Sequence, residues 1–112
     1  MKLVTAVVKP EKLDQVVHAV AAAGARGLTA TEVRGFGQEY GQHSADRPAG
    51  AALLVLPKLR IEVLVSDELA WPLAEAMAKA VSTGSIGDGK IWISPVEGAL
   101  RVRTGERDLA AV

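Results

Sequence analysis

Apolar and polar positions follow two different rhythms along the chain. Residues 2–9 form a short run rich in valine, which predicts a buried strand. From Glu11 onward the apolar side chains fall three and four residues apart, the spacing of one helical face, and Gly24 is a suitable end for that helix. Residues 28–35 alternate and carry β-branched side chains, so they predict a second strand.

The second half of the chain repeats this series. Residues 59–65 alternate strictly, which predicts a strand with one apolar face. A serine and an aspartate suited to a helix start follow, and then an apolar stripe at helical spacing runs from Leu69 to Ala80. Pro72 lies within that stripe and predicts either a kink or a late start of the helix. Residues 90–96 predict a last long strand, and residues 100–103 predict a short edge strand.

The resulting order, βαββαβ, predicts an α+β fold of the ferredoxin-like kind. Such a fold has an antiparallel four-stranded sheet with both helices on one face. Because the other face would lack helices and 49% of the residues are apolar, we expect that face to pack on further copies of the chain. A length of 112 residues fits one domain, covering residues 1–112.

A long connection, residues 37–56, separates the second predicted strand from the third. It is rich in glycine and small polar residues, and connections of this length are usually functional or disordered. Two interpretations stay open at this point. The connection is either an exposed hairpin tip or a loop that touches a partner and changes shape with a ligand.

Composition excludes several classes of function. The 13 basic and 13 acidic residues cancel, so no broad field attracts nucleic acid or an anionic membrane. The absence of cysteine excludes disulfides and thiol catalysis. The N-terminal run is too short for a signal peptide, and no apolar run approaches the ~20 residues of a membrane span, so we expect a cytoplasmic protein. With two Trp, one Tyr and one Phe, an aromatic surface for RNA is not expected.

The stretch TGSIGDGKIW, residues 83–92, carries the most distinctive chemistry. Gly84, Gly89 and Lys90 reproduce the G-x-x-x-x-G-K spacing of a phosphate-binding P-loop. However, Ile91 replaces the expected Ser or Thr, and the predicted helix precedes the loop instead of following it. We therefore expect an anion-binding loop without Walker-type hydrolysis.

Other polar residues offer weaker signals. In an extended segment Arg101 and Arg103 would point the same way and could grip a polyphosphate. Glu62 lies on the strand face away from the core and could accept a hydrogen bond from a ribose hydroxyl or an exocyclic amine, with ordinary cross-strand pairing as the equal alternative. His43 lies near Glu39 and Asp46, but no regular spacing supports a metal site there. His18 is expected to be solvated on the first helix. No arrangement of side chains predicts catalysis.

Four stretches stand together in one order: KLVTAVVKPEKLD, GLTATEVRGFG, LPKLRIEVLV and TGSIGDGKIWISPVEGALRVRTGE. They resemble the PII signal-transduction proteins from Met1 to about Glu106, and TG-x-IGDGKI and R-x-RTGE are the most specific motifs. The resemblance implies a non-enzymatic homotrimer that binds ATP or ADP in clefts between neighbouring subunits. Its T-loop, residues 37–56, would control a target protein in nitrogen or related metabolic signalling, and residues 104–112 would form a C-terminal tail.

By position, the resemblance also implies which residues surround the nucleotide. Gly87, Asp88, Gly89 and Lys90 would line the phosphates, and Arg101 and Arg103 would reach the same phosphates from the adjacent subunit. The other implied contacts are Val7, Thr29, Glu62 and Leu64 around the adenine and ribose, with Gly35, Phe36, Gly37 and Gln38 where the T-loop begins.

Several positions depart from the family pattern. Gln38 replaces the usual arginine, and Glu39 replaces the glutamine that helps to hold Mg²⁺ and 2-oxoglutarate. A carboxylate at Glu39 could still ligate Mg²⁺, but it would repel 2-oxoglutarate, whose other implied contact, Lys58, is retained. Ala49 and Ala51 exclude the phosphorylation and nucleotidylation known at those positions.

The remaining residues of the T-loop are those that the resemblance places against a partner protein. The residues expected to contact it are Tyr40, His43, Asp46 and Arg47, and the partner would be a membrane transporter or a metabolic enzyme. Two alternatives remain: a slow ATPase that uses Glu39, and a metal-responsive adaptor that uses Glu39, His43 and Asp46.

Overall fold

The computed structural model of the chain describes residues 1–37 and 55–112. The regular elements follow the predicted order: β1 (Lys2–Val8), α1 (Leu13–Ala22), β2 (Thr29–Gly35), β3 (Leu56–Val65), α3 (Asp67–Val81) and β4 (Gly89–Pro95). Two short 3₁₀ turns, Pro10–Lys12 and Asp108–Ala111, complete the described elements.

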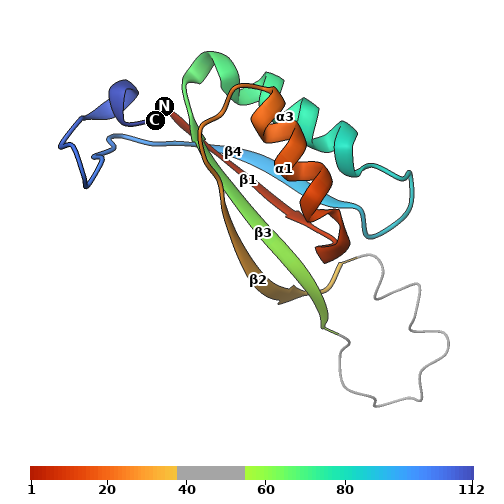
Figure 1. The fold of residues 1–112 in the computed structure, drawn as a ribbon. Coiled ribbons are helices and arrows are strands. Elements are labelled where there is room, and N and C mark those ends of the chain that lie inside the picture. Colours follow the sequence, from red (N-terminus) through yellow and green to blue (C-terminus); the bar gives the residue numbers. More distant parts are fainter. Residues whose placement is uncertain (38–54) are drawn as a thin grey trace, which may run out of the picture.

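The four strands form one sheet in the order β2-β3-β1-β4, and each neighbouring pair is antiparallel. Both helices lie on the same face of this sheet (Figure 1). The predicted ferredoxin-like α+β fold is therefore confirmed. Strand alternation sends Val4, Ala6 and Val8 into the core under the helices, where they meet the buried face of β3 and the buried stripe of α3. The fully buried core side chains include Ile61, Val63, Leu73, Met77 and Val16.

The opposite face of the sheet carries no helix among the described elements (Figure 1). Thr5 faces this side, and its partners across the sheet are Glu62 on β3 and Trp92 on β4. Trp92 is 43% exposed. An apolar side chain of that size on an uncovered sheet face favours the predicted packing of this face on other copies.

The ends of the helices agree in part with the sequence. Gly24 follows α1 with φ 91°, and its N–H donates to the carbonyl of Ala21, as expected of a glycine stop. By contrast, α3 begins at Asp67 and continues through Pro72 to Val81, so the predicted late start is wrong. Proline removes one backbone hydrogen bond there, and the burial of Leu73 and Met77 against the sheet holds the helix across that position.

The predicted edge strand at residues 100–103 is also wrong. Leu100 makes only an isolated bridge to Arg107, and the chain turns tightly between them. The Arg101 N–H donates to the Glu106 carbonyl at 2.9 Å, and the Gly105 N–H donates to the Arg101 carbonyl at 2.8 Å, with Gly105 at φ 73°. The glycine allows a turn that an extended strand would not contain. Arg101 and Arg103 therefore do not share a face through strand alternation.

Within residues 1–37 and 55–112, no helix is both long enough and apolar enough to cross a membrane.

Candidate functional site

The loop between α3 and β4, residues 82–88, is shaped by its glycines. Gly84 has φ 78°, Gly87 has φ 98°, and Gly89, the first residue of β4, has φ 111°. These are left-handed conformations that side chains other than glycine rarely adopt. A left-handed residue within a turn directs neighbouring backbone N–H groups toward one point, which is how an anion-binding nest forms. The predicted order of helix, loop and strand is confirmed, so the loop differs from a Walker P-loop.

The carboxylate of Asp88 folds this loop back onto its own start. Its Oδ2 accepts hydrogen bonds from the N–H of Thr83 at 2.7 Å and of Gly84 at 3.0 Å, and its Oδ1 accepts the Thr83 hydroxyl at 2.5 Å. The Thr83 hydroxyl, followed by the Thr83 N–H, holds the pKa of the Asp88 carboxyl below its usual value, and Lys9, with Nζ 3.9 Å from Oδ1, acts in the same direction. The ionised Asp88 side chain therefore holds the end of the loop against its start.

Two backbone N–H groups in the middle of the loop remain available to donate hydrogen bonds to a ligand. In the described part of the chain, the N–H groups of Thr83, Gly84, Ser85 and Asp88 are engaged within the loop, whereas no hydrogen bond engages that of Ile86 or Gly87. Neighbouring free donors of this kind suit an oxyanion.

A hollow of about 480 Å³ opens beside these donors, and we call it the lysine hollow. It unites predicted nucleotide-site residues from three segments, together with Lys58, whose side chain is largely buried. Asp88 does not line it, although the resemblance placed this residue on the phosphates. The lining residues are Val7, Gly35, Phe36, Gly37, Lys58, Gly87, Gly89 and Lys90.

A second hollow, of about 460 Å³, lies toward the other end of the strands, and we call it the arginine hollow. Here Glu62 lines the wall and also pairs with Arg60, whose Nε lies 3.1 Å from Glu62 Oε1. Both residues belong to β3, so this ion pair lies within one strand and is not the cross-strand pairing considered as the alternative for Glu62. The residues that line the arginine hollow are Leu3, Arg26, Gly27, Leu28, Thr29, Glu62, Leu64, Arg101, Ala111 and Val112.

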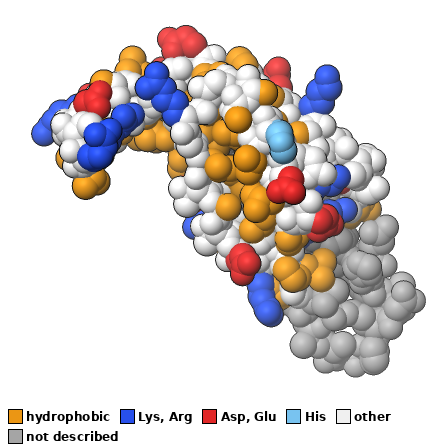
Figure 2. All heavy atoms as spheres, viewed as in Figure 1, with side chains coloured by type: hydrophobic (Ala, Val, Ile, Leu, Met, Phe, Trp, Pro, Cys, Tyr) orange, Lys and Arg blue, Asp and Glu red, His pale blue; other side chains and the backbone are white. Residues whose placement is uncertain are grey.

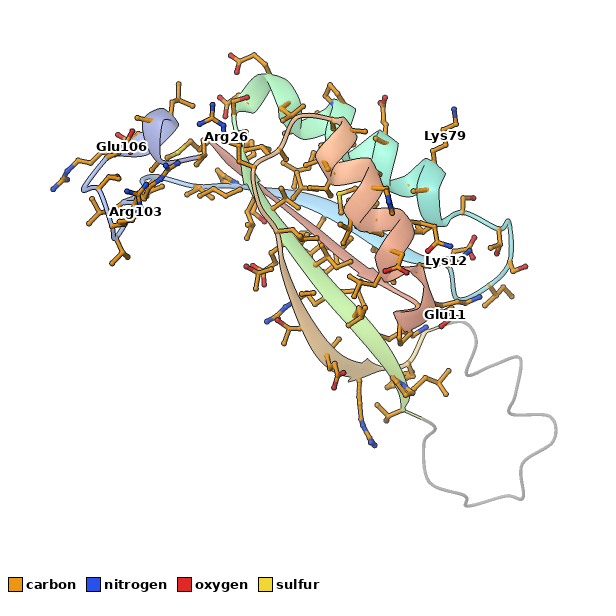
Figure 3. All side chains as sticks on the ribbon, viewed as in Figure 1. Glu11, Lys12, Arg26, Lys79, Arg103 and Glu106 are labelled. Carbon is orange, nitrogen blue, oxygen red and sulfur yellow. The ribbon has the colours of Figure 1, made fainter. Side chains whose placement is uncertain are left out.

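The arginines of the C-terminal segment lie far from Lys90 of the same chain. Lys90 and Pro95 are five positions apart on β4, a span of about 17 Å at strand rise, and the segment carrying Arg101 and Arg103 continues beyond that end of the sheet. Figure 3 shows Arg26 and Arg103 at this end and Lys12 at the other. Figure 2 shows Lys and Arg side chains gathered on the C-terminal segment.

One chain therefore cannot place Lys90 and Arg103 on the same phosphate group. Within one chain Arg101 instead lies with Nη1 3.7 Å from Oε1 of Glu106.

Several features of the site were missed by sequence reasoning. Gly27 and Arg26 lie two and three residues before Thr29, so their proximity to it was readable, but nothing marked them as part of a hollow. The bonds from Thr83 to Asp88 depend on loop conformation and had no pattern signal. Gln38, Glu39, Tyr40, His43, Asp46 and Arg47 lie outside the described residues, as does most of the T-loop.

The alternative metal site is likewise untested, because its three side chains lie in that stretch. Among residues 1–37 and 55–112, no three His, Cys, Asp or Glu side chains gather as metal ligands would. His18 is exposed, as expected, and its Nδ1 lies 2.7 Å from the Asp14 carbonyl oxygen.

Comparison with known proteins gives consistent matches. A family model described as "Nitrogen regulatory protein P-II" matches residues 1–106. The chain is 48% identical to "Nitrogen regulatory protein P-II" of Cereibacter sphaeroides and 46% identical to the protein of that name from Rhizobium etli. It is 43% identical to "Nitrogen regulatory protein GlnK" of Escherichia coli K12. Each similarity extends over 112 residues and all of both chains.

Proposed function

The chain belongs to the nitrogen regulatory protein P-II family, and from that premise we propose that it is a trimeric sensor of ATP and ADP. In this proposal the bound nucleotide sets the state of residues 37–56, which control a target protein without chemical turnover. The observation that carries the proposal is the glycine loop: Gly87, whose N–H is free, lines the lysine hollow together with Lys90, and the neighbouring Ile86 has a second free N–H.

Phosphate is the chemical group that this hollow suits best. Backbone N–H groups bind an oxyanion by donating hydrogen bonds and need no buried positive charge to do so. The Lys90 ammonium adds a positive charge at the same place. Mg²⁺ would neutralise further charge on a bound triphosphate. Asp88, the one carboxylate in the loop, is held by Thr83 and Gly84 and does not line the hollow, so it does not oppose an anion there.

The arginine hollow would supply the other half of the site from a neighbouring subunit. Arg101 lines it together with Thr29, Glu62 and Leu64. If Arg101 reaches the phosphates of a nucleotide that a neighbour's Lys90 holds, then Thr29, Glu62 and Leu64 line the same cleft as Arg101. Glu62 then offers a carboxylate oxygen to the ribose or the base, while Arg60 fixes its orientation.

The lysine hollow ends at the start of the T-loop, and this position explains how a bound nucleotide would change the loop. Gly35 closes β2, and Phe36 and Gly37 line the hollow at the start of the T-loop. A ligand that contacts them differently as ATP and as ADP would shift the equilibrium of the loop by that difference in affinity. Lys58 lines the same hollow from the other flank of the loop and could contact a metabolite there.

Calorimetric titration with ATP and ADP, with and without Mg²⁺ and 2-oxoglutarate, tests the proposal. We expect micromolar-range or tighter binding to wild type, and at least about tenfold weaker ATP binding in Lys90→Ala and Arg103→Ala. Lys79→Ala is the matched control, because Lys79 lies on the last turn of α3 and points away from the body (Figure 3).

Each outcome of this titration has a clear meaning. Unchanged ATP affinity in both Lys90→Ala and Arg103→Ala would remove the site assignment. A higher ATP affinity in the presence of 2-oxoglutarate would show reciprocal coupling and would place the metabolite in the site despite Glu39. A nucleotide affinity that 2-oxoglutarate does not change would identify a sensor of adenylate state alone.

A further inference from the structure

The Asp88 side chain lies on the other side of its loop from the lysine hollow. It lines a groove between α3 and β4 together with Ser82, Ala78 and Trp71, and it is absent from the lining of the hollow where Gly87, Gly89 and Lys90 meet. Its oxygens are engaged by Thr83 and Gly84, and only 21% of the side chain is exposed. Gly89 and Lys90 line both the groove and the hollow, so Asp88 is connected to a phosphate in the hollow through the loop that it holds.

We propose that Asp88 is a positioning residue, whose carboxylate fixes the glycine loop in its phosphate-binding shape before any ligand arrives. The inference rests on the proposed function of the lysine hollow, and it assigns Asp88 a role different from a direct phosphate contact.

The hydrogen bonds explain how the fixation works. By accepting the N–H groups of Thr83 and Gly84, Asp88 joins the second and third residues after α3 to the last residue before β4. The Thr83 hydroxyl then accepts the Ser85 N–H at 3.3 Å, and the Asp88 N–H donates to the Ser85 carbonyl at 3.4 Å. All four of these loop donors are used internally, which leaves Ile86 and Gly87 as the ones that can face a ligand.

Preorganisation is the physical benefit. A loop that must be ordered on binding loses conformational entropy at that moment, and the loss weakens the complex. A loop that is already fastened avoids most of this cost. Lys9 supports the fastening, because its Nζ lies 3.9 Å from Asp88 Oδ1 and offsets the carboxylate charge.

The test compares Asp88→Ala, Asp88→Asn and Thr83→Val by ATP titration and by amide hydrogen exchange of the nucleotide-free protein. We expect roughly tenfold weaker ATP binding in Asp88→Ala. Asparagine keeps an oxygen acceptor, so Asp88→Asn should recover most of the affinity. Thr83→Val should weaken binding too, and adding it to Asp88→Ala should cause little further loss, because both changes break the same contact.

Three results would overturn the proposal. The first is an Asp88→Asn protein that binds ATP as poorly as Asp88→Ala, with a loss that appears only when Mg²⁺ is present, since that pattern marks a metal ligand. The second is additivity of the Thr83 and Asp88 changes. The third is unchanged exchange of the Thr83 and Gly84 amides in Asp88→Ala.

The exchange measurement separates this inference from the proposed function. It needs no nucleotide, so faster exchange of the Thr83 and Gly84 amides in Asp88→Ala supports the fastening even if wild type fails to bind ATP. Absence of ATP binding by wild type would instead remove the proposed function, and with it the part of the inference that concerns phosphate.

Discussion

Gly89 lies so close to Val7 that a β-carbon added at Gly89 would stand 2.1 Å from the Val7 carbonyl oxygen. The contact joins the first residue of β4 to the end of β1, where Lys90 pairs with Val7 across the two strands. Gly89 also has φ 111°, a conformation that side chains rarely adopt. Glycine at this position therefore sets both the start of the strand and the direction in which Lys90 leaves the loop.

The first prediction follows directly. Gly89→Ala should lower the free energy of unfolding by about 3 kcal/mol or more, because the clash is with backbone and cannot be relieved by a rotamer change. Urea denaturation measures the loss, and ATP affinity should fall with it. Gly105→Ala is the matched control: its φ is 73°, but nothing lies within 4 Å of the added carbon, so we expect a cost of about 1–2 kcal/mol. Equal costs in the two variants would contradict the role of the contact with Val7.

The second prediction concerns the uncovered face of the sheet. Trp92 lies opposite Thr5 on this face, and Trp71 is a more exposed tryptophan on α3, at 66%. If the face packs on other copies, Trp92→Glu buries a charge in the subunit interface, which is costly. Light scattering should then report a trimer for wild type and Trp71→Glu and a monomer for Trp92→Glu. A trimeric Trp92→Glu protein would place the interface elsewhere.

The third prediction concerns pH. Hydrogen bonds from Thr83 hold the pKa of the Asp88 carboxyl below its ordinary value of 3.8. A carboxyl with a lowered native pKa stabilises the folded loop at pH above the ordinary value, and this contribution is lost as the pH falls through the lowered pKa. Exchange protection of the Thr83 and Gly84 amides, corrected for intrinsic rates, should stay constant from pH 7 to about 5 and decline at lower pH.

A local probe is needed for this measurement. The pKa of the Asp67 carboxyl is also lowered, first by a hydrogen bond from the α-amino group of Met1 and then by Lys2, so overall acid stability reports on both groups. Asp88→Asn supplies the control: the protection of its Thr83 and Gly84 amides should no longer decline with Asp88 titration. A decline that persists in this variant would assign it to another carboxyl.

The fold was largely readable from the sequence because its signals are local. Alternation in β3 and the apolar stripe of α3 fix which sides face the core, and the order of elements then leaves few topologies. Of the two outcomes predicted at Pro72, the late helix start is wrong, because burial of Leu73 and Met77 outweighs one missing helix bond. The segment at 100–103 misled because alternating arginines and β-branched Val102 read as a strand, while Gly105 makes a turn.

The candidate site was readable as residue types but not as an assembly. Gly87, Gly89 and Lys90 were expected at the phosphates, and they do line one hollow. Their separation from Thr29, Glu62 and Leu64 depends on strand register, which places the two groups toward opposite ends of the strands. The function of Asp88 depends on the side to which its carboxylate turns, and motif spacing carries no information on that direction.

The last prediction tests whether the two hollows meet across a subunit boundary. Lys90→Ala and Arg101→Ala subunits carrying different affinity tags should be produced together, and trimers that hold both tags isolated. In a closed ring each cleft takes its lysine hollow from one subunit and its arginine hollow from the next. Every mixed trimer then has a single cleft with both halves intact. Calorimetry should therefore show wild-type ATP affinity with fewer nucleotides bound per trimer.

A site contained within one chain gives the opposite result, because every subunit then lacks either Lys90 or Arg101 and no mixed trimer recovers affinity. Mixed trimers of Arg101→Ala and Glu62→Ala provide the control. Both residues line the arginine hollow, so every cleft should carry one defect and affinity should stay low. Recovery in the first mixture and its absence in the second would locate the nucleotide between neighbouring subunits. Recovery in both mixtures would contradict the division of the site between the two hollows.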